Sequence, residues 1–148
     1  MERGRLMPTS TFRVDLVAGV TTMMAAYIAA NPTKLVRHHR SIPAQFQDLP
    51  CSYLDVRPER VHHAQGLRDR VTSPSIVVVT RLTDNGETTD LHDILVDSLV
   101  DWFTSYPHIV AGTVWEDMTI ADEAIGEDNQ FVATRFSFDD ISIAEGRT

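Results

Sequence analysis

The sequence predicts an α+β fold, in which a mostly antiparallel or mixed β-sheet packs against two α-helices and ends in a C-terminal β-hairpin. Apolar residues recur at intervals of three and four over residues 12–28 and again over 91–106, which is the spacing of one helix face. Residues 75–82 contain a continuous β-branched run, typical of a strand covered on both faces. Two alternating runs, 113–121 and 132–138, are joined by a polar loop and predict the hairpin.

Length and composition favour one domain. The chain has 148 residues, of which 43% are hydrophobic, enough to bury a core. We expect a disordered arm at residues 1–9, a single α+β domain at 10–143 and a C-terminal tail at 144–148. Cys51 is the only cysteine, so an internal disulfide is excluded and a reducing compartment is expected. The start of the chain has no apolar segment of signal-peptide type, and we expect a soluble, intracellular protein.

The first predicted helix starts at a capping residue, Ser10 or Thr11, and ends where Asn31 precedes Pro32. Its longest uncharged stretch, residues 16–31, is too short and too rich in Ala, Thr and Gly to span a bilayer. Its apolar face is expected in the core.

The region 33–74 is the least regular, because four prolines interrupt it. Short strands are predicted near 51–56 and 60–63. The segment around Gly66, which carries Arg68, Asp69 and Arg70, is predicted to be an exposed loop.

The second helix follows the turn at 84–86, with Thr88 or Thr89 as its cap, and Pro107 stops it. One face is predicted to dock on the sheet. Its members are Leu91, Ile94, Leu95, Ser98, Leu99, Trp102 and Tyr106.

The last strand changes its alternation. From Val132 to Phe138, every second residue shares one side, but Ile141 and Ile143 have the opposite parity. We expect a β-bulge at Asp139–Asp140 that turns both isoleucines outward, toward a neighbouring subunit. The alternative is a strand that ends near Phe138 and is followed by a frayed tail.

Charge divides the sequence into two halves. Residues 1–83 contain 11 basic and 6 acidic residues, a balance of +5, whereas residues 84–148 contain 2 and 15, a balance of −13. One interpretation is solvated faces; the other is that opposite poles meet between subunits or on a partner. The arginine candidates for such an interface are Arg57, Arg60, Arg68 and Arg70.

The second helix also carries an acidic ridge at intervals of three, four and four, formed by Asp90, Asp93, Asp97 and Asp101. Like charges four residues apart weaken a helix, so the pattern favours a reason outside the helix. Asp93, Asp97 and Asp101 are candidates for an interface with basic groups or for a wall that repels phosphate. A tolerated acidic surface is the alternative.

Catalytic and metal-binding patterns are weak. Two histidine pairs, 38–39 and 62–63, could contribute one ligand each to a metal site with a carboxylate, although adjacent strand residues point to opposite sides. Surface or interface histidines are the simpler interpretation. Cys51 lacks a designated base, and no nucleophile or phosphate-loop motif is present. We therefore expect no enzyme activity, no cofactor and no metal, with a small His/carboxylate metal-dependent enzyme as the alternative.

The order of elements, with a helix containing LHDILVDSLVDWF before a C-terminal hairpin, resembles the tail terminator (tail completion) proteins of long-tailed bacteriophages. The resemblance implies a non-enzymatic virion protein forming a hexameric ring on the tail tube. The ring would join the tail tube protein on one face to a head-completion protein on the other. It also implies that genomic DNA passes through without specific binding, and a location in the virion neck, or in host cytoplasm during assembly. Another neck component, such as a head-completion or stopper protein, is the alternative within this class.

Overall fold

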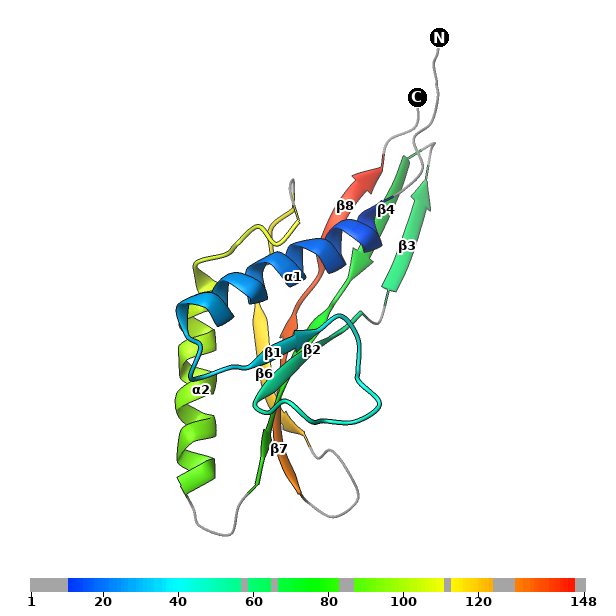
Figure 1. Ribbon diagram of the computed structural model, residues 1–148. Helices are drawn as coiled ribbons and strands as arrows, with labels where there is room; N and C mark the ends of the chain where they lie inside the picture. Colours follow the sequence, from blue (N-terminus) through cyan, green and yellow to red (C-terminus); the bar gives the residue numbers. More distant parts are fainter. Residues whose placement is uncertain are drawn as a thin grey trace.

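The computed structural model describes residues 11–56, 59–64, 67–82, 87–110, 113–123 and 130–145, and has the expected α+β fold (Figure 1). The expected arm at residues 1–9 lies outside the described residues. The elements are α1 (Phe12–Ala30), β1 (Arg37–His39), β2 (Cys51–Asp55), β3 (Glu59–Ala64), β4 (Leu67–Thr72), β5 (Ser75–Arg81), α2 (Glu87–Thr104), β6 (Met118–Glu123), β7 (Phe131–Phe138) and β8 (Ile141–Glu145).

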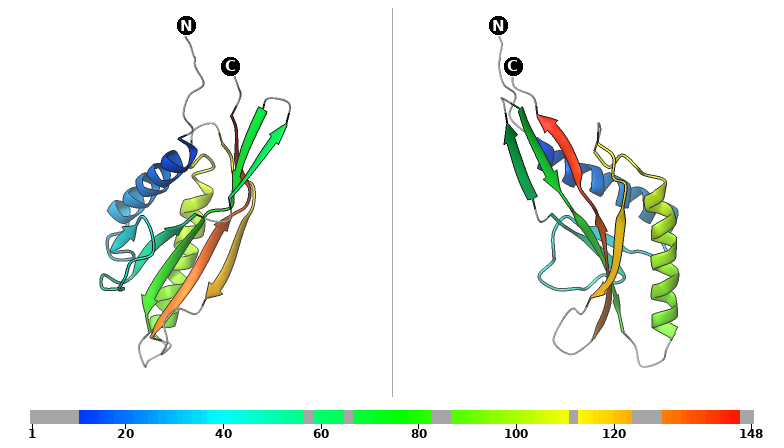
Figure 2. Two further views of the ribbon diagram at one scale, coloured as in Figure 1. Left: turned by 90° about the vertical axis from the view of Figure 1, so that its right-hand side faces the viewer. Right: turned by 180° about the vertical axis from the view of Figure 1, so that it is seen from behind.

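Two sheets share one long ribbon. The five-stranded sheet has the order β1-β2-β5-β7-β6, and all of its pairs except β1–β2 are antiparallel. The antiparallel three-stranded sheet, β3-β4-β8, extends beyond the helices at one end of the molecule, and we call it the extension (Figures 1 and 2). The five-stranded sheet and the two helices form the body.

The ribbon bends where the body meets the extension. Only two residues separate β4 from β5, and only two separate β7 from β8. At the bend, the backbone N–H of Phe138 donates to Pro74 O at 2.9 Å, and that of Asp140 donates to Ser73 Oγ at 3.1 Å. Asp140 has a φ of 55°, in the left-handed region that Asp tolerates better than most residues. The expected β-bulge and the alternative of a frayed tail are both wrong: β7 ends at Phe138, and the turn at residues 139–140 leads into β8, which pairs with β4 in the other sheet.

The orientation expected for Ile141 is wrong. Its side chain is 1% exposed and belongs to the same core as Phe136 and Phe138. The bend adds a change of strand direction to the change of parity, so Ile141 stays on the buried side. The backbone of Ile143 pairs with Arg70 in the extension, and its side chain lies outside the described residues.

Strand β5 is buried on both faces, as its β-branched run predicts. Ile76 and Val78 face both helices, which lie on one side of the sheet (Figure 2). Val77 and Val79 face the other way and pack with Tyr53 in a second apolar cluster. That second cluster is completed by the half-buried Phe46 and Leu49 from the loop before β2.

Helix α1 buries the predicted face and ends at Asn31, whose N–H donates to Tyr27 O at 2.8 Å. Thr11 is the N-cap residue, but its hydroxyl bonds the Asp15 carboxylate at 2.9 Å rather than a backbone N–H. By length and composition α1 could cross a membrane; here one face packs in the core. The buried residues are Phe12, Leu16, Val20, Met23, Met24 and Tyr27.

The docking face predicted for α2 is confirmed at Leu95 and Leu99 and wrong at Leu91 and Ile94. Leu91 and Ile94 are 58% and 53% exposed, whereas His92, Leu95, Leu99 and Phe103 are buried. Half-buried Trp102 flanks this face, and its indole N–H donates to Met23 O at 3.2 Å. The buried set has helical spacing, but its first member is a histidine, which an apolar pattern does not select.

Two further segments differ from expectation. Residues 113–117 are not a strand; there the Trp115 indole N–H donates to Tyr106 O at 2.8 Å, so the hairpin consists of β6 and β7 alone. The segment 68–70, predicted to be a loop, lies in strand β4. Its pairing partner β8 is 73 residues or more away in sequence, so local patterns do not reveal it.

Replacing Phe103 tests the corrected face of α2. The ring is fully buried and meets Phe136 and Phe138 edge-on, with centroids 5.2 Å apart in each pair. Phe103→Ala should lower the free energy of unfolding by about 3–5 kcal/mol. Leu91→Ala, on the exposed side, should change it by less than about 0.5 kcal/mol. Urea unfolding measures both, and equal losses would contradict this orientation.

A second test concerns Gly19, where α1 approaches the segment after α2. A Cβ at this position would collide with the carbonyl oxygen of Ile109. Gly→Ala in an exposed helix usually stabilises by about 1 kcal/mol, but here crowding should reverse the sign and destabilise by about 1–3 kcal/mol. The exposed neighbouring change Ala18→Gly should cost only about 1 kcal/mol. A thermal melt of Gly19→Ala above that of the wild type would refute the close approach.

Candidate functional site

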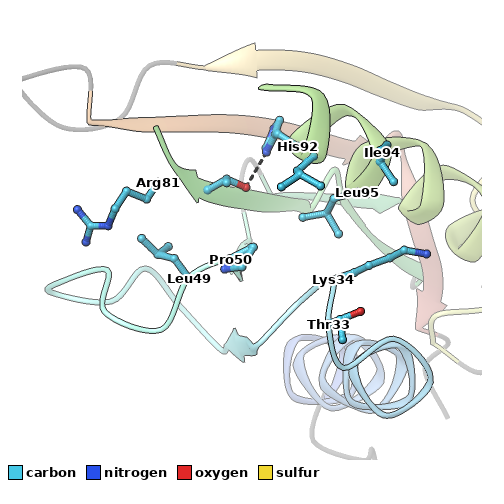
Figure 3. A pocket seen from close by; sticks show the side chains of 10 residues that line it. Thr33, Lys34, Leu49, Pro50, Arg81, His92, Ile94 and Leu95 are labelled. Carbon is cyan, nitrogen blue, oxygen red and sulfur yellow. Dashed lines mark hydrogen bonds between the residues drawn. The ribbon is translucent and has the colours of Figure 1, made fainter. Parts of the chain in front are cut away.

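A pocket of about 560 Å³ lies beside the first half of α2 (Figure 3). Three other segments contribute to it: the end of β5, the turn after α1, and the residues that lead into β2. Its lining comprises Thr33, Lys34, Leu49, Pro50, Thr80, Arg81, Leu91, His92, Ile94 and Leu95. The walls are therefore largely apolar, with two basic side chains among them.

A hydrogen-bonded chain of polar groups forms the inner wall. Thr134 donates its hydroxyl proton to Asp122 Oδ1 at 3.0 Å, so it accepts from His92 Nε2–H at 2.9 Å. His92 Nδ1 then accepts from the Thr80 hydroxyl at 2.8 Å. These bonds tie α2 to three strands of the body.

The ring of His92 links two buried hydroxyl groups and is not free to exchange protons with solvent. Its side chain is 3% exposed, and both ring nitrogens are occupied. Burial lowers the pKa of His92, and the carboxylates of Asp93 and Asp122 oppose that effect. The neutral ring satisfies the buried hydroxyls on either side, which makes a polar residue compatible with the core.

The outer rim of the pocket combines apolar and charged groups. Leu91 and Ile94 are exposed, and the exposed carboxylates of Asp90 and Asp93 are their neighbours on α2. Lys34 is half-buried, and the Arg81 guanidinium lies 5.5 Å from the centre of the Phe131 ring. An apolar side chain flanked by charges would match this rim.

The acidic ridge is exposed along its whole length. Asp90, Asp93, Asp97 and Asp101 all have exposed side chains, and α2 contains no Lys or Arg. Within the described part of the chain, none of the four forms an ion pair. The helix therefore presents a continuous acidic surface to whatever lies outside the subunit.

Three of the arginine candidates, Arg60, Arg68 and Arg70, lie on strands β3 and β4 of the extension. Arg60 is exposed on β3, and the backbone of Arg68 pairs with β8 while its side chain lies outside the described residues. Arg57 also lies outside them. Arg70 already bonds Glu59 at 2.9 Å and stacks over the Phe12 ring at 5.5 Å, so it holds α1 against the extension.

The two histidine pairs are not brought together, because 38–39 lie on β1 of the body and 62–63 on β3 of the extension. Among the described residues, no group of three or more His, Cys, Asp or Glu side chains is arranged to hold a metal. His38 Nδ1 instead pairs with Ser52 Oγ at 2.7 Å, while its buried Nε2 has no hydrogen-bond partner in this part of the chain. The pKa of His38 is lowered to about 4, mainly because the ring is buried and to a smaller extent because of the charge of neighbouring His39.

Cys51 is a buried packing residue. Burial raises the pKa of its thiol to about 11, so the sulfur remains protonated at neutral pH and is a poor nucleophile.

Sequence reasoning missed the pocket and His92. The available signal was the set 92, 95, 99 and 103, which has helical spacing as the predicted face does. No family model matches the chain, and no curated protein matches its sequence.

Stability should fall in acid because of His38. Its pKa is lower in the folded state than the ordinary value of 6.5, so the unfolded chain binds more protons between pH 6.5 and 4. A fall to about 4 corresponds to about 3 kcal/mol, present above pH 6.5 and lost as pH drops toward 4.

Urea unfolding at pH 7.5 and 4.5 measures this effect. His38→Asn should lose about 2–3 kcal/mol less than the wild type between the two pH values. An unchanged pH dependence in His38→Asn would show that the ring is not held neutral by burial.

Proposed function

We propose that this chain is a structural subunit of a long-tailed bacteriophage, a tail terminator that forms a ring on the tail tube and joins it to the head. The observation that carries the proposal is the extension. Its outer strands, β3 and β8, each pair only with β4 within the described chain. A strand at a sheet edge offers unpaired N–H and C=O groups to another chain.

Two different open edges suit a ring. A head-to-tail contact joins unlike surfaces of identical subunits, and it closes into a ring when the rotation between them is right. The edges β3 and β8 differ in sequence, so one edge need not pair with its own copy. The projection of the extension beyond the helices also leaves it accessible to a neighbour (Figure 1).

The separation of charge supports the same assembly. The exposed acids lie on α2, whereas Arg60 is exposed on the extension at the other end of α1 (Figure 1). Rotating one copy relative to the next can therefore bring opposite charges together. Single exposed pairs contribute only about 0–1 kcal/mol, so several must act together, and the contact should weaken in salt.

Passage of DNA is compatible with the acidic ridge. Binding to nucleic acid depends on neutralising phosphates with Lys and Arg, and α2 has neither. The second half of the ridge, Asp97 and Asp101, lies beyond the residues that line the pocket and is the better candidate for a channel wall. Its charge would repel the DNA backbone rather than hold it.

The test is the mass and shape of the assembly. Six copies of a 16.6 kDa chain give about 100 kDa, and negative staining should show a ring with a central hole. If the free protein is monomeric, the measurement is made with purified tail tubes, where the ring should appear at one tube end. A monomer under both conditions would sink the proposal, and binding only to heads would favour a head-completion or stopper protein.

Arg60→Glu tests the contribution of charge to the assembly. It should leave the melting temperature within about a degree or two, because the side chain is exposed, and should weaken association severalfold at low salt. Arg37→Glu, also exposed but on β1, is the control that should assemble normally.

A further inference from the structure

The pocket beside α2 has features of a contact surface that its own subunit leaves open. Leu91 and Ile94 are 58% and 53% exposed at its rim, next to the space of about 560 Å³. Exposed large apolar side chains at the edge of an apolar pocket mark a binding site more often than a solvated surface. Exposed Asp90 and Asp93 add a negative charge to one part of that rim.

One segment of this chain has the complementary chemistry. The N-terminal arm, residues 1–9, reads MERGRLMPT, with Arg3 and Arg5 followed directly by Leu6 and Met7. Two basic residues beside two flexible apolar ones match an apolar pocket with acids at its rim. Glu2 offers the opposite charge to Lys34 and Arg81, the basic residues of the same pocket.

Chain geometry keeps Leu6 and Met7 out of the pocket of their own subunit. The arm enters α1 at its N-terminal end, whereas the pocket begins with Thr33 and Lys34, beyond the other end of this 19-residue helix. The helix is about 28 Å long. Leu6 is five residues before Thr11, and five extended residues span at most about 17 Å. Leu6 and Met7 can therefore reach such a pocket only on another subunit.

We propose that the arm of one subunit docks in the α2 pocket of its neighbour. Leu6 and Met7 enter between Leu91 and Ile94, and the arginines lie against the start of the acidic ridge. The inference rests on the proposed assembly of identical subunits, and it gives that assembly a second contact besides the extension. It also assigns the first half of the ridge to an interface rather than to a channel.

Disulfide trapping in full-length chains tests the contact. A Leu6→Cys chain is mixed with a mass-tagged Ile94→Cys chain under mild oxidation, and the mixed disulfide is measured by mass. The native Cys51 is buried and protonated, so it need not be removed. The control partner is Val114→Cys, whose position is 50% exposed but does not line the pocket.

The expected result is at least tenfold more mixed disulfide with Ile94→Cys than with Val114→Cys, and a severalfold loss when Arg3 and Arg5 are both changed to Glu. Leu91→Cys, at the other exposed rim position, should give the same result. It provides a second test of the pocket in case Ile94→Cys folds poorly. Equal yields for pocket and control positions would overturn the proposal, as would capture of Ile94→Cys only by an added tail or head protein.

The oligomeric mass of the same samples, taken free and on tail tubes, separates the two proposals. A ring without the selective disulfide refutes the arm contact and leaves the assembly standing. A monomer in both conditions refutes the assembly, and the arm contact with it.

Discussion

The burial of β5 on both faces is the constraint on which the rest of the body depends. Its apolar run leaves no side for solvent, so two separate layers must cover it. The helices supply one layer, and the loop before β2 supplies the other through Phe46 and Leu49. The flanking strands β2 and β7 are then fixed by hydrogen bonding to β5 on either side. Removing either layer would expose one face of the central strand.

The ribbon formed by β4–β5 and β7–β8 continues from the body into the extension. The bend at residues 73–74 and 139–140 is held by backbone bonds and by the left-handed conformation of Asp140. Ile141 is buried just beyond it, so the base of the extension is anchored in the core. On the helix side, Arg13 and Arg70 both bind the Glu59 carboxylate, which connects the start of α1 to β3 and β4. A projecting sheet with a fixed base can present its edges in a defined direction, which a flexible hairpin could not.

The two sides of helix α2 differ in composition and in burial. The inner side is apolar except for His92, whose ring bonds the two threonines of β5 and β7. The outer side carries only acids among its charged residues, together with two exposed apolar residues beside the pocket. The proposed contacts rest on these exposed groups. The arrangement also explains how a helix can accept unfavourable spacing of aspartates: buried Leu95, Leu99 and Phe103 supply the stabilisation that the ridge lacks.

The sequence by itself determined the elements whose signals are local. The spacing in α1, the β-branched run of β5, and the alternation in β7 each predicted an element and its buried side, because burial of one face imposes a period on neighbouring residues. The acidic ridge and the unusual parity at Asp139–Asp140 were also visible. The ridge is exposed on α2, and the change of parity marks the bend between the two sheets. What depended on distant partners could only be decided by the tertiary structure. Strand β4 is predicted as a loop because its charged residues do not indicate a buried face; it pairs with neighbouring β3 on one side and with distant β8 on the other. Ile141 was placed outside because parity predicts direction only while a strand stays in one sheet. The α2 pocket and its inner histidine were missed for the same reason: a histidine is buried only when threonines from other strands satisfy both of its nitrogens, and those threonines become its neighbours only after the chain has folded.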